Sequence, residues 1–223
     1  TKMKFKQKKN TIIRKVVLED LCNFLNNYMS MKKQVARTLF DTRFISPFTT
    51  YFGIWDDFHV PNTYSHYADI AAETLLLKLQ PLIEKEIGLK LTPSYSYTRI
   101  YKQGDILGRH KDRFACEIST TLNLGGDPWP IYLSPNENVG IPDEKKITFD
   151  SKAKGVKINL EPGDMLIYRG CELEHWREQF KGEECSQVFL HYNLKTKKSV
   201  LFDGRPHLGL PDFFKKEKED KNG

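Results

Sequence analysis

Two histidines and one aspartate have the residue types of a metal site. His110 and Asp112 are two positions apart in the segment Leu107-Gly-Arg-His-Lys-Asp, and His175 follows much later in the chain. On an extended strand alternate side chains share a face, so His110 and Asp112 can address one point. Two imidazoles and one carboxylate on one face of a metal ion leave the opposite positions open, as in non-haem Fe(II) sites. The three residues are therefore candidate metal ligands.

The same three-residue pattern also arises by chance, because the chain contains six histidines. The alternative interpretation is a surface His110 beside an unrelated Asp112, with His175 at the end of a strand. The surrounding elements have to decide between the two interpretations.

A succession of short strands is predicted to position these residues. After Gly88, alternating or β-branched runs are each closed by Gly, Pro, Asn or Asp, up to about residue 194. Short strands at such spacing are typical of a β-sandwich or jelly roll. We expect strands at residues 94–101, 117–124, 131–133, 147–149, 156–160, 165–168, 175–177 and 187–193.

The first part of the chain is predicted to be helical. Residues 19–29 have helical spacing of apolar side chains, and residues 64–87 form a longer helical pattern. Pro81 should kink the second helix, and Gly88 should end it. The apolar face of the first helix is expected to contain Leu21, Phe24, Leu25 and Tyr28.

These elements predict one domain that is mainly β with flanking helices. Residues 1–93 supply helical support and an aromatic-rich segment, residues 94–195 the jelly-roll catalytic core, and residues 196–223 a C-terminal extension with a charged tail. We expect the aromatics of residues 44–58 to be core rather than a lid or stacking platform. The long loop at residues 125–146 is expected to fold over the active site. Residues 203–211 are expected only to pack alongside the barrel.

Composition excludes several classes of protein. The chain has 223 residues, 39% hydrophobic and 29% charged, and no apolar run approaches the roughly 20 residues that span a bilayer. Collagen, coiled coil, membrane protein and disulfide-rich toxin are therefore excluded. The four cysteines are far apart and form no CxxC pair, which suits a reducing compartment. A cytoplasmic location is the default expectation, although N-terminal trimming stays open because the chain begins at Thr1.

The N-terminus carries a cluster of positive charge. Seven of the first fifteen residues are Lys or Arg and none is acidic, within a formal net charge of +6 for the whole chain. Clustered bases can supply the salt-dependent phosphate contacts of nucleic-acid binding. We favour a solvated, partly frayed terminus instead.

Three segments together resemble the prolyl-4-hydroxylase-like Fe(II)/2-oxoglutarate dioxygenases. Residues 101–112, Tyr-Lys-Gln-Gly-Asp-Ile-Leu-Gly-Arg-His-Lys-Asp, resemble that family's Tyr-x-x-Gly…His-x-Asp stretch. Residues 117–126, Glu-Ile-Ser-Thr-Thr-Leu-Asn-Leu-Gly-Gly, are similar to the strand and loop that follow it. Residues 162–175, from Pro-Gly-Asp-Met-Leu-Ile-Tyr to His175, are similar to the family's Gly-Asp…His block. The resemblance covers about residues 95–195.

The resemblance implies a double-stranded β-helix, a jelly roll with the metal at its open mouth. It implies His110, Asp112 and His175 as iron ligands and 2-oxoglutarate and O₂ as co-substrates, with ascorbate as a further cofactor candidate. The implied chemistry is decarboxylation of 2-oxoglutarate to succinate and CO₂, coupled to hydroxylation of an unactivated C–H bond.

The sequence departs from the family where the distal carboxylate of 2-oxoglutarate is bound. A buried carboxylate needs a cation or several donors, and the family usually has Arg or Lys about ten residues after the distal His. Gln187 stands there by register. We hypothesise that Arg177 replaces the missing cation, because it is two residues past His175 on the same strand face. Tyr101 and Asn123 are further candidates beside the co-substrate.

Each of these assignments has an alternative. Arg177 could instead lie on the surface, paired with Glu174 or Glu178. His191 shares a face with Gln187, but we expect it to be a satisfied core histidine. Arg99 and Tyr97 alternate with Tyr101, and our hypothesis is that this face of the strand lines the cavity. For Tyr97, ordinary strand packing is the stronger expectation.

Three functions follow from these interpretations. The first is hydroxylation of an amino-acid side chain, prolyl in a peptide or protein. The second is oxidative dealkylation of nucleic acid on the same fold, which the basic N-terminus favours faintly. The third is a catalytically silent jelly roll that binds a partner, which the missing cation at Gln187 favours.

Overall fold

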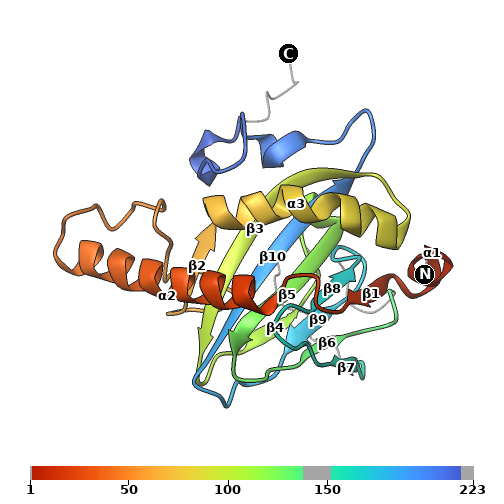
Figure 1. Cartoon of the computed structure of the whole chain (residues 1–223), viewed down its shortest axis with the longest axis horizontal. Coiled ribbons are helices and arrows are strands. Elements are labelled where there is room, and N and C mark those ends of the chain that lie inside the picture. Colours follow the sequence, from red (N-terminus) through yellow and green to blue (C-terminus); the bar gives the residue numbers. More distant parts are fainter. Residues whose placement is uncertain (1, 138–151, 217–223) are drawn as a thin grey trace.

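The computed structural model describes residues 2–137 and 152–216, and its centre is a pair of antiparallel sheets (Figure 1). In the described residues the larger sheet has the order β1-β8-β5-β10-β3-β2 and the smaller sheet the order β4-β9-β6-β7. The strands are β1 (Asn10–Ile13), β2 (Tyr64–Tyr67), β3 (Leu91–Lys102), β4 (Leu107–His110), β5 (Ile118–Gly126), β6 (Ile131–Leu133), β7 (Val156–Ile158), β8 (Met165–Tyr168), β9 (His175–Arg177) and β10 (Glu184–Leu194). The predicted fold class, mainly β with a jelly-roll core and flanking helices, is confirmed.

Two long helices cover the outer face of the larger sheet. Figure 1 shows α2 and α3 crossing that sheet on the same side. Leu25 of α2 and Leu76 of α3 belong to one buried cluster with Ile100 of β3 and Leu190 of β10. The helices are α1 (Lys2–Lys8), α2 (Glu19–Asp41) and α3 (Ile70–Ile87), with short 3₁₀ turns at Phe114–Cys116, Leu201–Gly204 and Asp212–Phe214.

Strand β10 shows how the chain separates the core from the site. Its residues Val188 and Leu190 face the helices and join the apolar cluster. The alternate residues Gln187, Phe189 and His191 point into the space between the two sheets, because side chains alternate along a strand. Gln187 and His191 are both buried there. The inward positions of the larger sheet are therefore the source of polar groups for a site.

The predicted helices form, but with different limits. Helix α2 continues to Asp41, and its buried residues are Cys22, Leu25, Met29 and Ala36. The predicted face was wrong for Leu21 and Phe24, which are 42% and 67% exposed. The second helix begins only at Ile70, because Asp69 caps it by accepting from the backbone N–H of Ala72 at 3.0 Å. It runs through Pro81 and ends at Gly88, whose φ of 73° suits a glycine.

The predicted strands form in the expected order. Residues 131–133, 165–168 and 175–177 match β6, β8 and β9, and the others shift by a few residues. The predicted strand at residues 147–149 lies outside the described residues, as does the second part of the expected lid, residues 138–146. Strands β1, β2 and β4 were not among the predicted strands; each lies at an edge of its sheet.

The N-terminus is not frayed, which corrects the sequence-based expectation. Strand β1 pairs with β8 along its whole length. Lys9 contacts Glu172 and Glu137, and Nη1 of Arg14 lies 2.6 Å from the Asp164 carboxylate. Two of the seven clustered bases, Lys9 and Arg14, are therefore paired with acidic residues.

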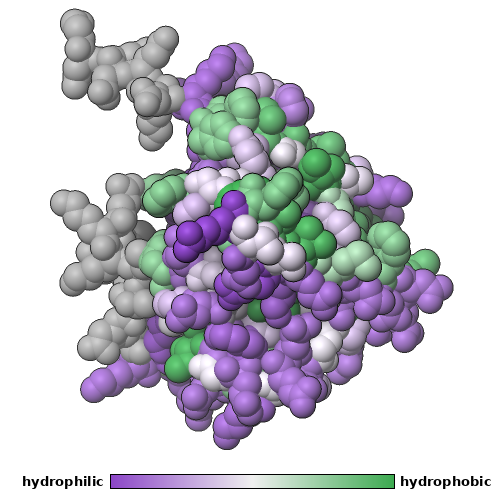
Figure 2. All heavy atoms as spheres, turned by 90° about the vertical axis from the view of Figure 1, so that its left-hand side faces the viewer, coloured by the Kyte–Doolittle hydropathy of each residue, from purple (hydrophilic) through white to green (hydrophobic). Residues whose placement is uncertain are grey.

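The aromatic-rich segment lies mostly on the surface, so the expectation that it is core was wrong for most of its members. Phe52 and Trp55 pack partly buried against the apolar cluster. The exposed members are Phe44, Phe48, Tyr51 and Phe58. Figure 2 faces the side of the molecule that is on the left of Figure 1, and green apolar side chains gather above the middle of the view.

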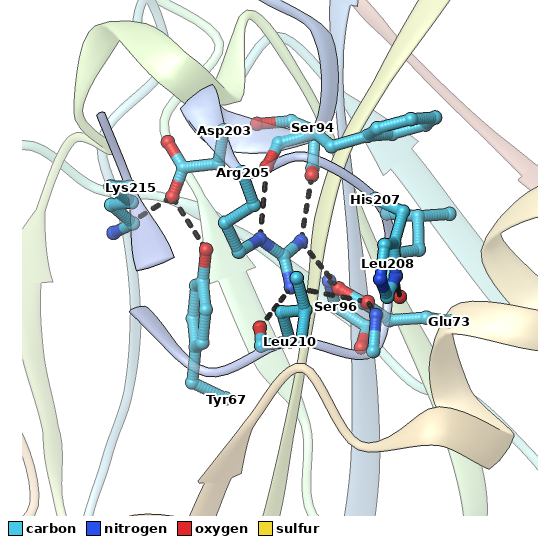
Figure 3. A network of polar contacts seen from close by, with 12 residues as sticks. Tyr67, Glu73, Ser94, Ser96, Asp203, Arg205, His207, Leu208, Leu210 and Lys215 are labelled. Atoms are coloured by element: carbon cyan, nitrogen blue, oxygen red, sulfur yellow. Dashed lines mark hydrogen bonds and ion pairs between the residues drawn. The ribbon is translucent and has the colours of Figure 1, made fainter. Parts of the chain in front are cut away.

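The C-terminal extension is fixed to the fold by a buried ion pair (Figure 3). Arg205 and Glu73 of α3 are both buried, and Nη2 of Arg205 lies 2.8 Å from Oε1 of Glu73. The same guanidinium donates to three backbone carbonyls, those of Ser94, Phe202 and Leu210. The extension does more than pack alongside the barrel, because its Arg205 supplies the cation that pairs with the buried Glu73.

A second contact of this extension is made with β2 and with the segment that follows β4. Asp203 accepts hydrogen bonds from the Tyr67 hydroxyl at 2.8 Å and from both terminal nitrogens of Arg113 at 2.7 and 3.2 Å. Arg113 follows Asp112 directly in sequence. The extension therefore steadies the backbone next to a candidate metal ligand.

No helix in the described part of the chain is both long enough and apolar enough to cross a membrane.

Candidate metal centre

The two sheets bring His110, Asp112 and His175 to one point. His110 ends β4 and is paired in register with His175, which begins β9. Asp112 follows β4, and its Oδ1 lies 3.6 Å from Nε2 of His110 and 3.3 Å from Nε2 of His175. One donor atom from each of the three lies within 4.8 Å of the others. His110 is 7% exposed, so the alternative of a surface histidine is wrong.

Backbone carbonyls fix the tautomers of both histidines. Nδ1 of His110 lies 2.8 Å from the carbonyl oxygen of Gly108, and Nδ1 of His175 lies 3.0 Å from that of Leu173. A carbonyl oxygen can only accept, so each Nδ1 carries a proton. In the neutral imidazole each Nε2 then keeps its lone pair, directed at Asp112. This is the state in which histidines bind a metal.

The electrostatics of the three residues are strongly coupled. Burial alone would raise the pKa of Asp112, but the nearby imidazoles of His175 and His110 hold it well below its usual range. Burial and the neighbouring His175 lower the pKa of His110. Burial also acts to lower the pKa of His175, but the Asp112 carboxylate outweighs it and raises that pKa. The site therefore holds an ionised carboxylate between two imidazoles.

A cavity of about 560 Å³ opens onto the three residues. Its polar walls include Asp57, Arg99, Arg113 and His191, and Tyr95, Tyr97 and Tyr101 supply aromatic surface. Such a hollow beside a metal site is large enough for a small co-substrate and one side chain of a substrate. His191 is buried and hydrogen-bonded, as expected, and it also lines this cavity.

Three neighbouring cavity residues, Asp57, Phe58 and His59, lie at the end of the aromatic-rich segment or directly after it, where no site residue was predicted. Asp57 pairs with Arg99, with Oδ1 2.9 Å from Nη2, and accepts a hydrogen bond from the Tyr97 hydroxyl. The ring of His59 lies 5.0 Å from that of His110, measured between centroids. Burial, together with His110, lowers the pKa of His59 to about 4. No local sequence pattern marks these residues, because only the tertiary fold brings them to the metal ligands.

The residues predicted to bind 2-oxoglutarate lie at two depths. Tyr101 lines the cavity, whereas Arg177, Gln187 and Asn123 are not among its lining residues. The ring of Trp129 lies between the two depths, 4.7 Å from the Tyr101 ring and 5.0 Å from the Arg177 guanidinium. The three deeper residues are all buried in the interior of the barrel.

Arg177 is a buried cation without an anionic partner among the described residues. It is 1% exposed, so the alternative of a surface residue paired with Glu174 or Glu178 is wrong. Its Nη1 donates to the Trp129 carbonyl at 2.6 Å, and its Nη2 donates more weakly to Thr121 at 3.4 Å. Its Nε has no hydrogen-bond partner in the described residues. A buried charge of this kind is costly unless an anion binds beside it.

Gln187 and Asn123 form a hydrogen-bonded cluster next to Arg177. Oε1 of Gln187 accepts from the Thr121 hydroxyl at 2.9 Å, and Nε2 donates to Oδ1 of Asn123 at 3.2 Å. Because Thr121 is also the acceptor for Arg177, the four side chains make one network. Gln187 thus stands near the cation but does not carry a charge itself.

The fold is shared with solved oxygenase structures, although no sequence-family model and no curated protein sequence matches this chain. A prolyl-4-hydroxylase of Pseudomonas putida is 15% identical, with coverage of 87% of this chain and 97% of that chain and a TM-score of 0.61. AviO1 from Streptomyces viridochromogenes is 14% identical, with coverage of 87% and 93% and a TM-score of 0.61. HygX from Streptomyces hygroscopicus, solved with nickel, 2-oxoglutarate and hygromycin B, is 13% identical, with coverage of 87% and 86% and a TM-score of 0.57.

Proposed function

We propose that this chain is an Fe(II)- and 2-oxoglutarate-dependent oxygenase that hydroxylates an amino-acid side chain, prolyl in a peptide or protein. One observation carries the proposal: His110, Asp112 and His175 direct three donor atoms to one point beside a cavity inside a jelly roll. The fixed tautomers make both imidazoles ready to bind without rearrangement.

The donor set fits iron. Two neutral imidazoles and one carboxylate, all on one side, suit a non-haem Fe(II) ion and leave positions for a co-substrate. With iron, 2-oxoglutarate and O₂ bound, such a site decarboxylates 2-oxoglutarate to succinate and CO₂ and hydroxylates a C–H bond. The cavity walls then have to orient the substrate carbon and keep water out. Ascorbate is proposed only as a reductant that keeps the metal ferrous.

Arg177 supports 2-oxoglutarate as the co-substrate. Its buried guanidinium has no carboxylate partner in the described residues, and its Nε has no hydrogen bond. A carboxylate of the co-substrate bound beside Arg177 would supply the missing anion and an acceptor for Nε. Gln187 and Asn123 belong to the network of Arg177, and Tyr101 lines the cavity, so these three are the proposed further donors.

The peptide substrate is favoured over nucleic acid by the placement of the basic N-terminus. Lys9 and Arg14 are engaged with acidic residues of the jelly roll, so they add little free positive charge. The sequence segments that resemble prolyl-4-hydroxylase-like enzymes point the same way. Steep salt dependence of DNA or RNA binding would instead favour the dealkylase alternative.

Turnover with the purified protein tests the proposal. We expect succinate to form only when Fe(II), 2-oxoglutarate and O₂ are all present, and an Asp112→Ala variant to form none. Proline-containing peptides and alkylated oligonucleotides, incubated in parallel, should show by mass spectrometry which of them gains or loses mass. Absence of succinate from protein that binds the metal would support the silent jelly roll instead.

A further inference from the structure

The two carboxylate oxygens of Asp112 have different neighbours. Oδ1 faces the Nε2 atoms of His110 and His175. Oδ2 accepts a hydrogen bond from the hydroxyl of Ser119 on β5, at 2.5 Å. Only one of the two oxygens therefore faces the point where the donor atoms meet.

His191 holds the Ser119 hydroxyl in this orientation. Nδ1 of His191 lies 3.1 Å from Oγ of Ser119. The hydroxyl has one proton, and its contact with Asp112 is much shorter than its 3.3 Å contact with the Cys116 carbonyl. If that proton goes to Asp112, Nδ1–H of His191 must donate to Oγ. The ring of His191 is itself packed 4.6 Å from the ring of Tyr95.

The absence of a side chain at Gly170 leaves room for the Asp112 carboxylate and the Ser119 hydroxyl. A Cβ at position 170 would lie 2.2 Å from Oδ2 of Asp112 and 2.3 Å from Oγ of Ser119. The carbonyl of Gly170 also accepts from the backbone N–H of Asp112 at 2.9 Å. The backbone of Gly170 is not in the left-handed region, so space rather than backbone freedom explains the glycine.

We propose that Ser119, His191 and Gly170 are positioning residues that restrict Asp112 to one-oxygen binding of the metal. This inference rests on the proposed function. An octahedral ion held by three protein atoms keeps three positions, two for the 2-oxo acid and one for O₂. A second oxygen from Asp112 would occupy one of these. The hydrogen bond from Ser119 keeps Oδ2 turned away.

The test compares metal binding in variants with and without this support. Ser119→Ala removes the hydroxyl, and Gly170→Ala pushes the same pair apart. Ser186→Ala is the matched control, because Ser186 is equally buried and its hydroxyl has no partner in the described residues. Titration with Co(II), followed by its visible absorption, reports both affinity and coordination geometry without turnover.

We expect Ser119→Ala and Gly170→Ala to weaken Co(II) binding by about 10-fold to 100-fold, with an altered absorption spectrum, as loss of a supporting hydrogen bond does elsewhere. Ser186→Ala should match the wild type. His191→Leu should behave like Ser119→Ala, whereas His191→Asn keeps a donor near Nδ1 and should restore most of the affinity. If Ser119→Ala does not fold, the comparison of His191→Leu with His191→Asn tests the positioning role.

Two results would overturn the inference in distinguishable ways. If the wild type binds Co(II) and Ser119→Ala and His191→Leu match it in affinity and spectrum, the positioning role is wrong and the proposed function stands. If the wild type binds no Co(II), the proposed function fails first.

Discussion

Arg99 and Arg177 are both buried arginines on inward-facing strand positions, yet their surroundings differ in charge. Arg99 lines the cavity and forms an ion pair with Asp57. Arg177 lies deeper and has only neutral acceptors in the described residues. A guanidinium already paired with a carboxylate has less to gain from a second anion. Arg177 is therefore the stronger candidate for the distal carboxylate of 2-oxoglutarate.

Replacing Arg177 by Leu tests this assignment. We expect the KM for 2-oxoglutarate to rise by about 10-fold to 100-fold, because a charge-assisted hydrogen bond contributes roughly 1.5–3 kcal/mol. Co(II) affinity should not change. Lys157→Leu, which removes an exposed cation from β7, is the control and should leave the KM unaltered. A KM for Arg177→Leu within twofold of the wild type would contradict the assignment.

At the scale of elements, the sequence predicted the limits of three short strands correctly, those of β6, β8 and β9. The limits of the longer strands β3, β5 and β10 shifted by a few residues, although these strands are also largely buried. Helix α2 was underestimated, because its later turns mix exposed and buried positions and Ala36 is the last buried residue. The segment at residues 64–67 was predicted as helix but pairs with β3, since tertiary pairing overrides a short local pattern.

The C-terminal extension yields a prediction of its own. Arg205→Leu leaves Glu73 as a buried carboxylate without its cation, which typically destabilises a fold by about 3–5 kcal/mol. Urea denaturation should show a loss of free energy of unfolding in that range. Lys215→Ala removes a more exposed ion pair with Asp203 and should cost less than about 1 kcal/mol. Equal losses in the two variants would show that the Arg205 pair is not a main support.

At the scale of the whole molecule, the candidate site combines local and long-range information. His110 and Asp112 are recognisable from their spacing, and His175 from the block that precedes it. Asp57, His59 and Asp203 reach the same region from far apart in the sequence, so no spacing rule identifies them. Sequence alone could therefore supply the metal ligands and the part of the cavity wall on β3, but not the wall residues from distant segments.

Buried histidines make the stability of the metal-free protein depend on pH. Burial lowers the pKa of His191 to about 4, and burial with His110 lowers that of His59 to about 4. In the unfolded chain both titrate near pH 6.5, so as pH falls the unfolded state takes up protons first. The contribution of these two histidines to the free energy of unfolding should be fully present above about pH 6.5 and decline toward pH 4. Thermal unfolding in a chelator should show this slope, and His191→Asn should reduce it.

Strand β1 has one more consequence, for the way the protein can be shortened. It is the outermost strand of the larger sheet, and it covers β8, whose four residues are all buried. Removing the first fifteen residues would leave the backbone N–H and C=O groups of β8 that now pair with β1 without partners at the edge of the sheet. Such an edge is a template for pairing with another polypeptide. We therefore expect a chain without these residues to self-associate along β8.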